Sequence, residues 1–290
     1  MTNPDTAQIE PARIDPAQGE MVPIEPAGRV RLDIDDGLAR LWLVRAEARN
    51  GIDLAMVQAL SSALDVVTAQ LEQGRVRALL IGADGPAFTV GGDLRHLAGE
   101  LERLPEELRI MIDMYHRDVL GRLAELPVPV VAAAQGAVAG GGLGLLWTAD
   151  VVLAADDLRI ATGFVHLALS GDGGSSWHLP RLVGLSRARE LIIGGRVLDA
   201  AEAQAWGLVG QVVPLAELAD TALDRARALA AGPTHALAAM KRLLLHSSTS
   251  SYREQLAAER DEIVGCARTG DAAEGIRAFG ERRAPRFSGR

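Results

Sequence analysis

The chain has 290 residues and a formal net charge of −8, and 48% of its residues are hydrophobic. The acidic balance and the lack of a long Lys/Arg run exclude the basic surface that nucleic acids or anionic membranes require, and no uninterrupted apolar run approaches the ~18 residues of a membrane span. Cys266 is the only cysteine, which excludes an intrachain disulfide framework or cysteine-based zinc site and suits a reducing cytoplasm. No His/Asp/Glu spacing indicates another metal site.

The first 28 residues differ in composition from the rest of the chain. They contain five prolines and closely spaced acidic residues, and Ile9–Ala12 returns in similar form at Ile14–Ala17 and Ile24–Ala27. This composition predicts a disordered leader over residues 1–28, although the repeat could also be a partner-binding tag. We expect residues 29–290 to form one domain, with an α/β core to about residue 200 and helices over about 201–290.

Short strands are predicted from the start of this domain. Val30–Ile34 and Ala39–Leu43 alternate apolar and polar residues on either side of Asp35-Asp36-Gly37, a pattern typical of a hairpin. Further strands are expected at Ala78–Ile81, Val128–Ala134, Val151–Ala154 and Arg159–Thr162.

Helices are predicted between and after these strands. Leu54–Glu72 has helical periodicity, and so does Leu94–Leu126 with an interruption near Pro105. Nearly everything from Ser175 onward also has a helical pattern. Strands that alternate with helices predict an α/β fold with a largely parallel sheet, and the helix-rich last third is either a cap or an assembly surface.

Two glycine-rich loops each follow a predicted strand and open a helix. Phe88–Leu94 contains Gly91 and Gly92, and Gln135–Leu145 contains Gly140, Gly141 and Gly142. At such a turn the first N–H groups of the helix lack intrahelical partners, and glycine lets a ligand approach them. The loops are therefore either anion-binding donors or simply tight turns, and neither matches a phosphate-binding pattern.

These segments resemble those of the crotonase (enoyl-CoA hydratase/isomerase) superfamily. The two glycine-rich loops are similar to its oxyanion-hole segments. Further resemblance lies in Arg45–Asn50, Asp172–Ser176 with Leu179–Gly184, and Glu274–Phe279 with Arg282–Phe287. The resemblance covers about residues 30–288. It implies a ββα spiral core with C-terminal helices, an acyl-CoA thioester as substrate, coenzyme A only as part of that substrate, and a homotrimer or dimer of trimers.

By position, the resemblance implies that the backbone N–H groups of Gly92 and Gly141 hold the thioester oxygen. It places substrate contacts at Arg45, Arg49, Asn50, Gly91, Asp93, Leu94, Gly140 and Phe164. Two of these assignments compete with simpler ones. A surface arginine is more often solvated than bound to phosphate. Asp93 could also be a base, or it could instead cap the helix that follows it.

The residues that a hydratase would need are missing. The two positions where the family's hydratases carry glutamates correspond to Gly144 and Phe164, so the resemblance disfavours water addition, which needs a base and an acid. Asp172 lies where the family's single-base isomerases carry a carboxylate. It is either the base of a Δ3,Δ2-enoyl-CoA isomerase or a cap of the helix at Trp177–Val183.

The acyl pocket is expected in the helical region after the first loop, although residues at helical spacing are also typical of a core. Its candidates are Leu94, Leu97, Leu101, Met111, Met114 and Tyr115, and His96 and His116 are each expected either to line it or to lie on a solvated face. Isomerisation is the leading hypothesis. The alternatives are hydration or another crotonase-type lyase or hydrolase reaction, a non-catalytic acyl-CoA-binding protein, and a serine hydrolase using Ser175 or Ser176, which the lack of G-x-S-x-G disfavours.

Overall fold

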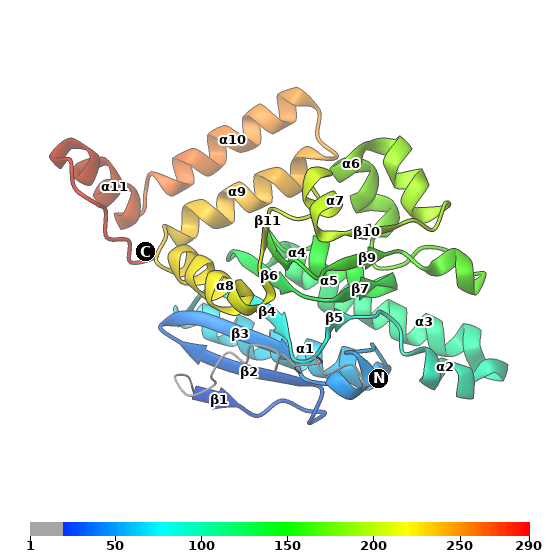
Figure 1. Ribbon diagram of the computed structural model, residues 1–290. Coiled ribbons are helices and arrows are strands. Elements are labelled where there is room, and N and C mark those ends of the chain that lie inside the picture. Colours follow the sequence, from blue (N-terminus) through cyan, green and yellow to red (C-terminus); the bar gives the residue numbers. More distant parts are fainter. Residues whose placement is uncertain (1–19) are drawn as a thin grey trace, which may run out of the picture.

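The computed structural model describes residues 20–290 of the chain, in which two β-sheets are surrounded by helices (Figure 1). The large sheet has the strand order β1-β2-β3-β4-β6-β8-β11. Its strands are β1 Glu20–Val22, β2 Val30–Asp35, β3 Gly37–Leu43, β4 Val76–Ala83, β6 Val130–Ala134, β8 Val151–Ala155 and β11 Gln211–Val213. The pairs from β3 to β11 are parallel and those from β1 to β3 antiparallel, so the predicted largely parallel sheet is confirmed.

The hairpin predicted around Asp35-Asp36-Gly37 joins β2 to β3. Asp35 is opposite Leu38, which leaves Asp36 and Gly37 as a two-residue turn. Both have positive φ, 43° and 79°. A turn of this type matches the twist of the two strands and favours Asp-Gly.

The predicted leader needs a correction at its C-terminal end. Strand β1 pairs with β2 in antiparallel register, and Ile24 is buried in the core. The prediction of disorder is therefore wrong for residues 20–28, because apolar side chains there find a sheet edge and a core to pack against. The rest of the predicted leader, residues 1–19, lies outside the described residues.

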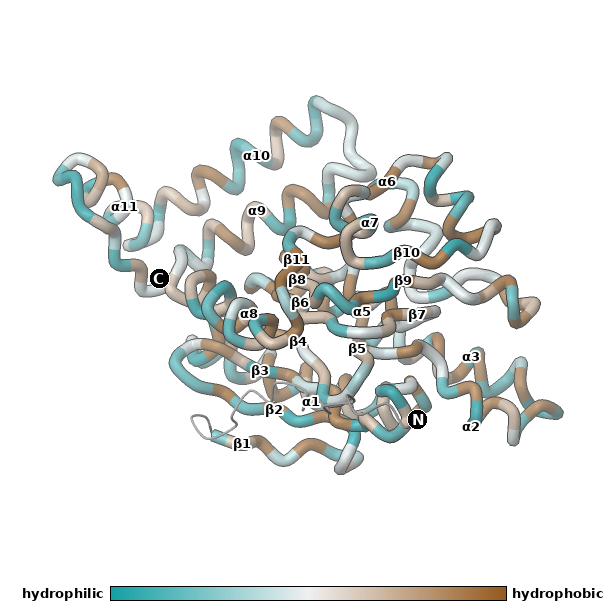
Figure 2. The backbone as a smooth tube through the Cα atoms, in the orientation of Figure 1, coloured by the Kyte–Doolittle hydropathy of each residue, from teal (hydrophilic) through white to brown (hydrophobic). Residues whose placement is uncertain are grey.

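The two faces of the large sheet carry separate layers of core. Along β4, Leu79 and Ile81 face one apolar cluster, whereas Ala78 and Leu80 face the other, as expected for side chains that alternate across a buried strand. Helix α1 (Leu54–Glu72) packs in the first cluster and α8 (Leu215–Ala230) in the second. Figure 2 shows the apolar colouring concentrated on the central strands.

Helix α1 has the bounds that the sequence predicted. Asp53 caps it by accepting a hydrogen bond from the Met56 N–H (2.7 Å). Among the described residues it is the one helix long and apolar enough to cross a membrane. Seven of its residues, from Met56 to Val67, are buried against the sheet, so its hydrophobicity is accounted for by the core.

The small sheet positions the two glycine-rich loops. Its order is β10-β9-β7-β5, with β5 Ala87–Thr89, β7 Ala137–Ala139, β9 Arg159–Ala161 and β10 Val197–Asp199. Strands β5 and β7 pair in parallel, and each leads directly into one glycine-rich loop. Because parallel strands end at the same edge, the two loops leave the sheet side by side.

The remaining helices follow the predicted regions with two differences. Helical structure over 94–125 breaks at Glu100, and Pro105 lies in the first turn of the next helix, where proline is tolerated. The C-terminal third also contains β10 and β11, which the sequence did not predict.

The remaining helices have the following bounds: α2 Leu94–Gly99, α3 Leu104–Met114, a π-helical turn Tyr115–Gly121, α4 Arg122–Glu125, α5 Leu143–Trp147, α6 Ser175–Ile192, α7 Ala200–Ala205, α9 Thr234–Ser247, α10 Tyr252–Cys266 and α11 Gly270–Glu281. Short 3₁₀ turns lie at Ala46–Ala48, Leu101–Arg103, Gly140–Gly142 and Phe164–Leu167.

Candidate active site

The two glycine-rich loops are in direct contact. A Cβ atom on Gly91 would lie 2.6 Å from the Ala139 carbonyl oxygen and 3.2 Å from the Gly141 nitrogen. Gly91 also has φ +79°, a conformation that residues with a side chain rarely adopt. Only glycine therefore allows the backbones of the two loops to approach this closely.

The orientation of the Gly92 N–H follows from its peptide plane. The Gly91 carbonyl accepts a hydrogen bond from the Ile52 N–H at 2.7 Å. The N–H of a trans peptide points opposite to its carbonyl, so the Gly92 N–H points away from Ile52. Gly92 lines a cavity of about 480 Å³.

The Gly141 N–H is oriented by the short helix that it opens. The Gly140 carbonyl accepts from the Leu143 N–H, so it points along the helix axis. The N–H of the same peptide then points back out of the helix N-terminus, where donors lack intrahelical partners and the dipole favours negative charge. Gly140 and Gly141 line the same cavity as Gly92.

The Asp172 carboxylate lies beside the second of these glycines. Its Oδ2 atom would be 2.6 Å from a Cβ atom on Gly141, and its side chain is 20% exposed. The side chain does not cap α6, because Gly174 occupies the N-cap position and no side-chain cap bond is present there. The Asp172 backbone carbonyl instead accepts from the N–H and hydroxyl of Ser175. The capping alternative is therefore wrong, and Asp172 is the only carboxylate among the residues that line the cavity.

A histidine that the sequence did not connect with Asp172 completes the polar part of the site. His116 Nε2 lies 2.7 Å from Asp172 Oδ1. The neighbouring Tyr115 is buried and donates its hydroxyl to the Gly141 carbonyl (3.1 Å). Burial, and then the negative charge of Asp172, raise the pKa of Tyr115 above its ordinary value, so it acts as a hydrogen-bond donor at neutral pH.

Arg45 and Asp93 meet each other in the structure. The Arg45 guanidinium contacts the carboxylates of Asp93 (2.8 Å) and Asp53 (3.1 Å). Asp93 also caps α2 by accepting from the Arg95 and His96 N–H groups. Burial raises the pKa of Asp93, but the hydrogen bonds from His96 and Arg45 outweigh it and hold that pKa below its ordinary value. Arg45 therefore forms ion pairs with the N-cap residues of α1 and α2, and the prediction that Asp93 is a helix cap is confirmed.

Asn50 supports the first glycine-rich loop. Its buried side-chain amide donates to the carbonyls of Asp84 and Ala87, both at 2.9 Å. Its backbone carbonyl accepts from the Thr89 hydroxyl (2.7 Å), which in turn accepts from the Gly91 N–H (3.2 Å). Asn50 is thus buried and stabilises the loop through hydrogen bonds, whereas its neighbour Arg49 is exposed.

The position of the first hydratase glutamate has no room for a side chain. A Cβ atom on Gly144 would lie 2.7 Å from Leu120 Cδ1 and 2.8 Å from the Gly173 carbonyl oxygen. At the second position, Phe164 is 8% exposed and lines the cavity. Neither position can supply an acid or a base.

The rest of the cavity wall is mostly apolar. Leu94, Leu97, Met111 and His116 line it as predicted, whereas Leu101, Met114 and Tyr115 are not among its lining residues. His96 does not line it either and is exposed, which is the solvated alternative. The apolar side chains around it are Val90, Leu94, Leu97, Leu108, Met111, Ile112, Ala139, Phe164, Leu167 and Leu169. No lysine or arginine is among the lining residues, and His116 and His166 are the only groups that can carry positive charge there.

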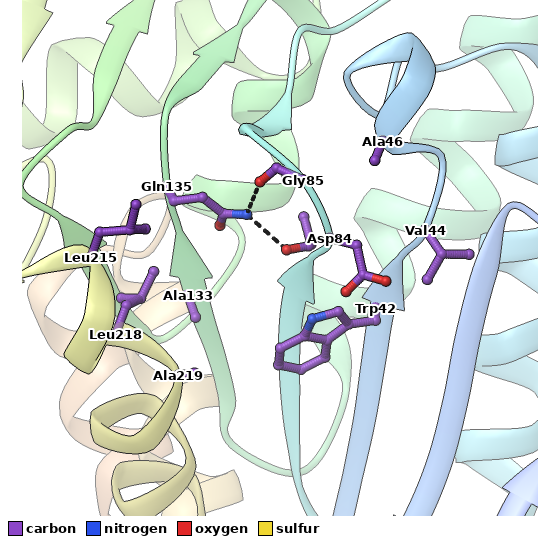
Figure 3. Close-up of a pocket in the computed structure, with 11 residues that line it drawn as sticks. Trp42, Val44, Ala46, Asp84, Gly85, Ala133, Gln135, Leu215, Leu218 and Ala219 are labelled. Atoms are coloured by element: carbon purple, nitrogen blue, oxygen red, sulfur yellow. Dashed lines mark hydrogen bonds between the residues drawn. The ribbon is translucent and has the colours of Figure 1, made fainter. Parts of the chain in front are cut away.

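A second cavity, of about 380 Å³, opens at the carboxyl ends of β3, β4 and β6 (Figure 3). Gln135 lies at its wall and donates to the carbonyls of Ala83 and Gly85 (2.7 and 3.0 Å). Asp84, its one carboxylate, pairs with Arg31 at 3.1 Å. These polar groups are already paired, so this cavity offers a binding surface rather than acid–base chemistry.

The chain is similar to known proteins over most of its length. The family model "Enoyl-CoA hydratase/isomerase" matches residues 33–290. The chain is 34% identical over 257 residues to 1,2-epoxyphenylacetyl-CoA isomerase of Escherichia coli (strain K12), covering 89% of this chain and 97% of that protein. It is 31% identical over 261 residues to trans-2-decenoyl-(acyl-carrier-protein) isomerase of Streptococcus mutans, covering 89% and 97%. Among solved structures, an enoyl-CoA hydratase from Bacillus anthracis matches with a TM-score of 0.83 at 30% identity, covering 90% and 100%.

Proposed function

The chain belongs to the enoyl-CoA hydratase/isomerase family, and from this premise we propose that it moves a carbon–carbon double bond of an acyl-CoA thioester from the 3,4 to the 2,3 position, with Asp172 as the base. Its fold is the α/β crotonase fold, with two sheets and C-terminal helices, as the sequence predicted. The relatives include isomerases and a hydratase, so the reaction is argued from the site itself.

The two glycine N–H groups supply the electrostatic part of the mechanism. When a proton leaves C2, negative charge develops on the thioester oxygen. Donors from Gly92 and Gly141 that meet this oxygen stabilise the enolate more than the neutral substrate. Each such donor is typically worth about 3–4 kcal/mol of barrier.

The observation that carries the proposal is the single carboxylate in the cavity wall, beside the Gly141 donor. Oδ2 of Asp172 takes the proton from C2, and the electron pair moves onto the thioester oxygen. Oδ2 of Asp172 then returns the proton to C4, and the enolate becomes the conjugated thioester. The reaction needs one group for both proton transfers, and the site offers one.

Hydration fits the site less well. Water addition needs one group to activate water and another to protonate carbon. The Gly144 position is filled by Leu120 and the Gly173 backbone, and Phe164 is apolar. A glutamate pair could not be accommodated there without moving the loop that carries Asp172.

The cavity wall also favours one class of acyl group. Its apolar side chains and the absence of lysine or arginine among the lining residues would leave a second carboxylate desolvated and unpaired, which is strongly unfavourable. We therefore propose an uncharged, apolar acyl chain or ring.

The coenzyme portion is proposed to lie along Arg45–Asn50, with the exposed Arg49 as the phosphate contact because Arg45 is already paired. The cavity shown in Figure 3 includes Ala46 of this stretch and could receive an apolar part of the coenzyme. Coenzyme A enters as part of the substrate, and the mechanism uses no separate cofactor.

Assembly as a homotrimer or dimer of trimers is also part of the proposal. The C-terminal helices α10 and α11 extend away from the sheets (Figure 1). Helices α9 to α11 expose large apolar side chains. Leu244, Ile263 and Phe279 are 74%, 70% and 88% exposed. Exposed apolar area of this kind is typical of a protein–protein interface.

The test is turnover of a 3-enoyl-CoA with an apolar chain, followed by absorbance of the conjugated product. We expect wild type to form the 2-enoyl-CoA, and Asp172→Asn to lose on the order of 10²–10⁴-fold in kcat. Conversion of a 2-enoyl-CoA into the 3-hydroxyacyl-CoA at a higher rate would favour a hydratase. Binding of acyl-CoA without any turnover would favour a non-catalytic protein.

A further inference from the structure

His116 lies outside the motifs that indicated the active site, yet its ring contacts the base. Its Nε2 is 2.7 Å from Oδ1 of Asp172, although the two residues are 56 positions apart. The histidine side chain is 47% exposed and lines the cavity. The contact therefore joins the proposed base to a side chain at the cavity mouth.

The two oxygens of Asp172 have different surroundings. Oδ1 faces His116, whereas Oδ2 faces the Cα of Gly141, the residue that provides the second N–H donor. The terminal torsion of an aspartate is broad and nearly two-fold, so the carboxylate is not fixed by its own rotamer preference. A partner on one oxygen decides which oxygen faces the substrate.

We propose that His116 is a positioning residue: it donates its Nε2–H to Oδ1 of Asp172 and thereby holds Oδ2, with its lone pairs free, towards C2 of the substrate. This inference rests on the proposed function of Asp172 as the base. Neutral histidine suffices for the role, because one ring nitrogen is then a donor.

The local helix geometry supports the assignment. Tyr115 and His116 open a π-helical turn, a rare form that is frequent at functional sites. Tyr115 donates to the carbonyl of Gly141 at 3.1 Å, and His116 contacts Asp172. One turn thus braces both the loop that carries an N–H donor and the carboxylate that acts beside it.

The consequence is a loss of turnover rather than of binding. Without His116 the carboxylate can rotate and shift, and a misplacement of about 1 Å can cost on the order of 10²-fold in rate. We expect His116→Leu to lower kcat by about 10–100-fold with KM changed less than about threefold. His116→Gln retains an N–H donor and should recover most of this loss.

The experiment measures kcat, KM and the melting temperature of wild type, His116→Leu and His116→Gln with 3-enoyl-CoA, together with the isotope effect of C2 deuteration. The matched control is His96→Leu, since His96 is exposed and does not line the cavity. The proposal predicts a larger isotope effect in His116→Leu, recovery in His116→Gln, and no change in His96→Leu.

Two results would overturn the proposal, and a third separates it from the function itself. If His116→Leu turns over as fast as wild type, the contact has no positioning role. If Leu and Gln are equally slow and mainly raise KM, His116 only lines the acyl pocket. If wild type does not isomerise any 3-enoyl-CoA, the proposed function fails, and the positioning role that rests on it fails with it.

Discussion

Alanine in place of either donor glycine tests whether the site needs only the backbone N–H group or also the space that the missing side chain leaves open. Alanine keeps both N–H groups, and neither glycine has a positive φ. A Cβ atom on Gly92 would meet only Leu97 Cδ1, at 3.7 Å, which is an ordinary contact. A Cβ atom on Gly141 would lie 2.6 Å from Oδ2 of Asp172, so the carboxylate would have to move by about 1 Å to reach normal contact.

The expected magnitudes follow from these distances. A shift of about 1 Å in a reacting group can cost on the order of 10²-fold, or about 2.7 kcal/mol of barrier. We therefore expect Gly141→Ala to lower kcat/KM by about 100-fold and Gly92→Ala by less than about tenfold. Asp172 is partly exposed and can move, so both variants should unfold within about 1 kcal/mol of wild type.

The assay is steady-state isomerisation of a 3-enoyl-CoA, with urea unfolding as the measure of stability. The reasoning would be refuted if Gly141→Ala retained wild-type activity while Gly92→Ala lost it. A large loss of stability in Gly141→Ala would show that the carboxylate cannot yield and that the activity loss has another cause.

Two further predictions concern the neighbourhood of the site. Gly144→Ala adds a Cβ within 2.8 Å of Leu120 and Gly173, so we expect about 1–3 kcal/mol lower unfolding free energy and a reduced kcat; unchanged values would mean that the Gly173 turn yields freely. Burial, and then the charge of Arg181, lower the pKa of His178 from 6.5 to about 4. The unfolded chain therefore takes up a proton at this residue before the folded chain does, and stability present above about pH 6.5 is lost as the pH falls towards 4. Urea unfolding at pH 7 and pH 5 should show that wild type loses about 1–2 kcal/mol more than His178→Asn; an equal loss would contradict the assignment.

Local pattern was sufficient for much of the fold. Helix α1 could be predicted with its bounds, since Asp53 caps it and its apolar spacing is continuous. The hairpin followed from Asp36-Gly37, whose positive φ values suit a two-residue turn. The two glycine-rich loops could be recognised because each follows an apolar strand, and their contact follows from the pairing of β5 with β7.

Long-range contacts account for what the sequence did not predict. Asp172 lies in the loop before α6, and its partner lies 56 residues away in the π-helical turn, so no spacing rule connects the two. Arg45 lies in the stretch that resembles a coenzyme-binding segment, but its guanidinium lies between Asp53 and Asp93. Strands β10 and β11 have three residues each, and they form because each pairs with a strand at the edge of a sheet, β10 with β9 and β11 with β8. Such short strands carry too little periodicity of their own.

The most direct test of the central claim is deuterium exchange at C2 of an arylacetyl-CoA that cannot isomerise. Exchange requires only enolate formation, so it depends on the Gly92 and Gly141 donors and on Asp172, whatever reaction follows. The account predicts that wild type incorporates deuterium from D₂O at C2, and that Asp172→Asn binds the thioester but exchanges at least about 100-fold more slowly. Exchange by Asp172→Asn at the wild-type rate would contradict the account.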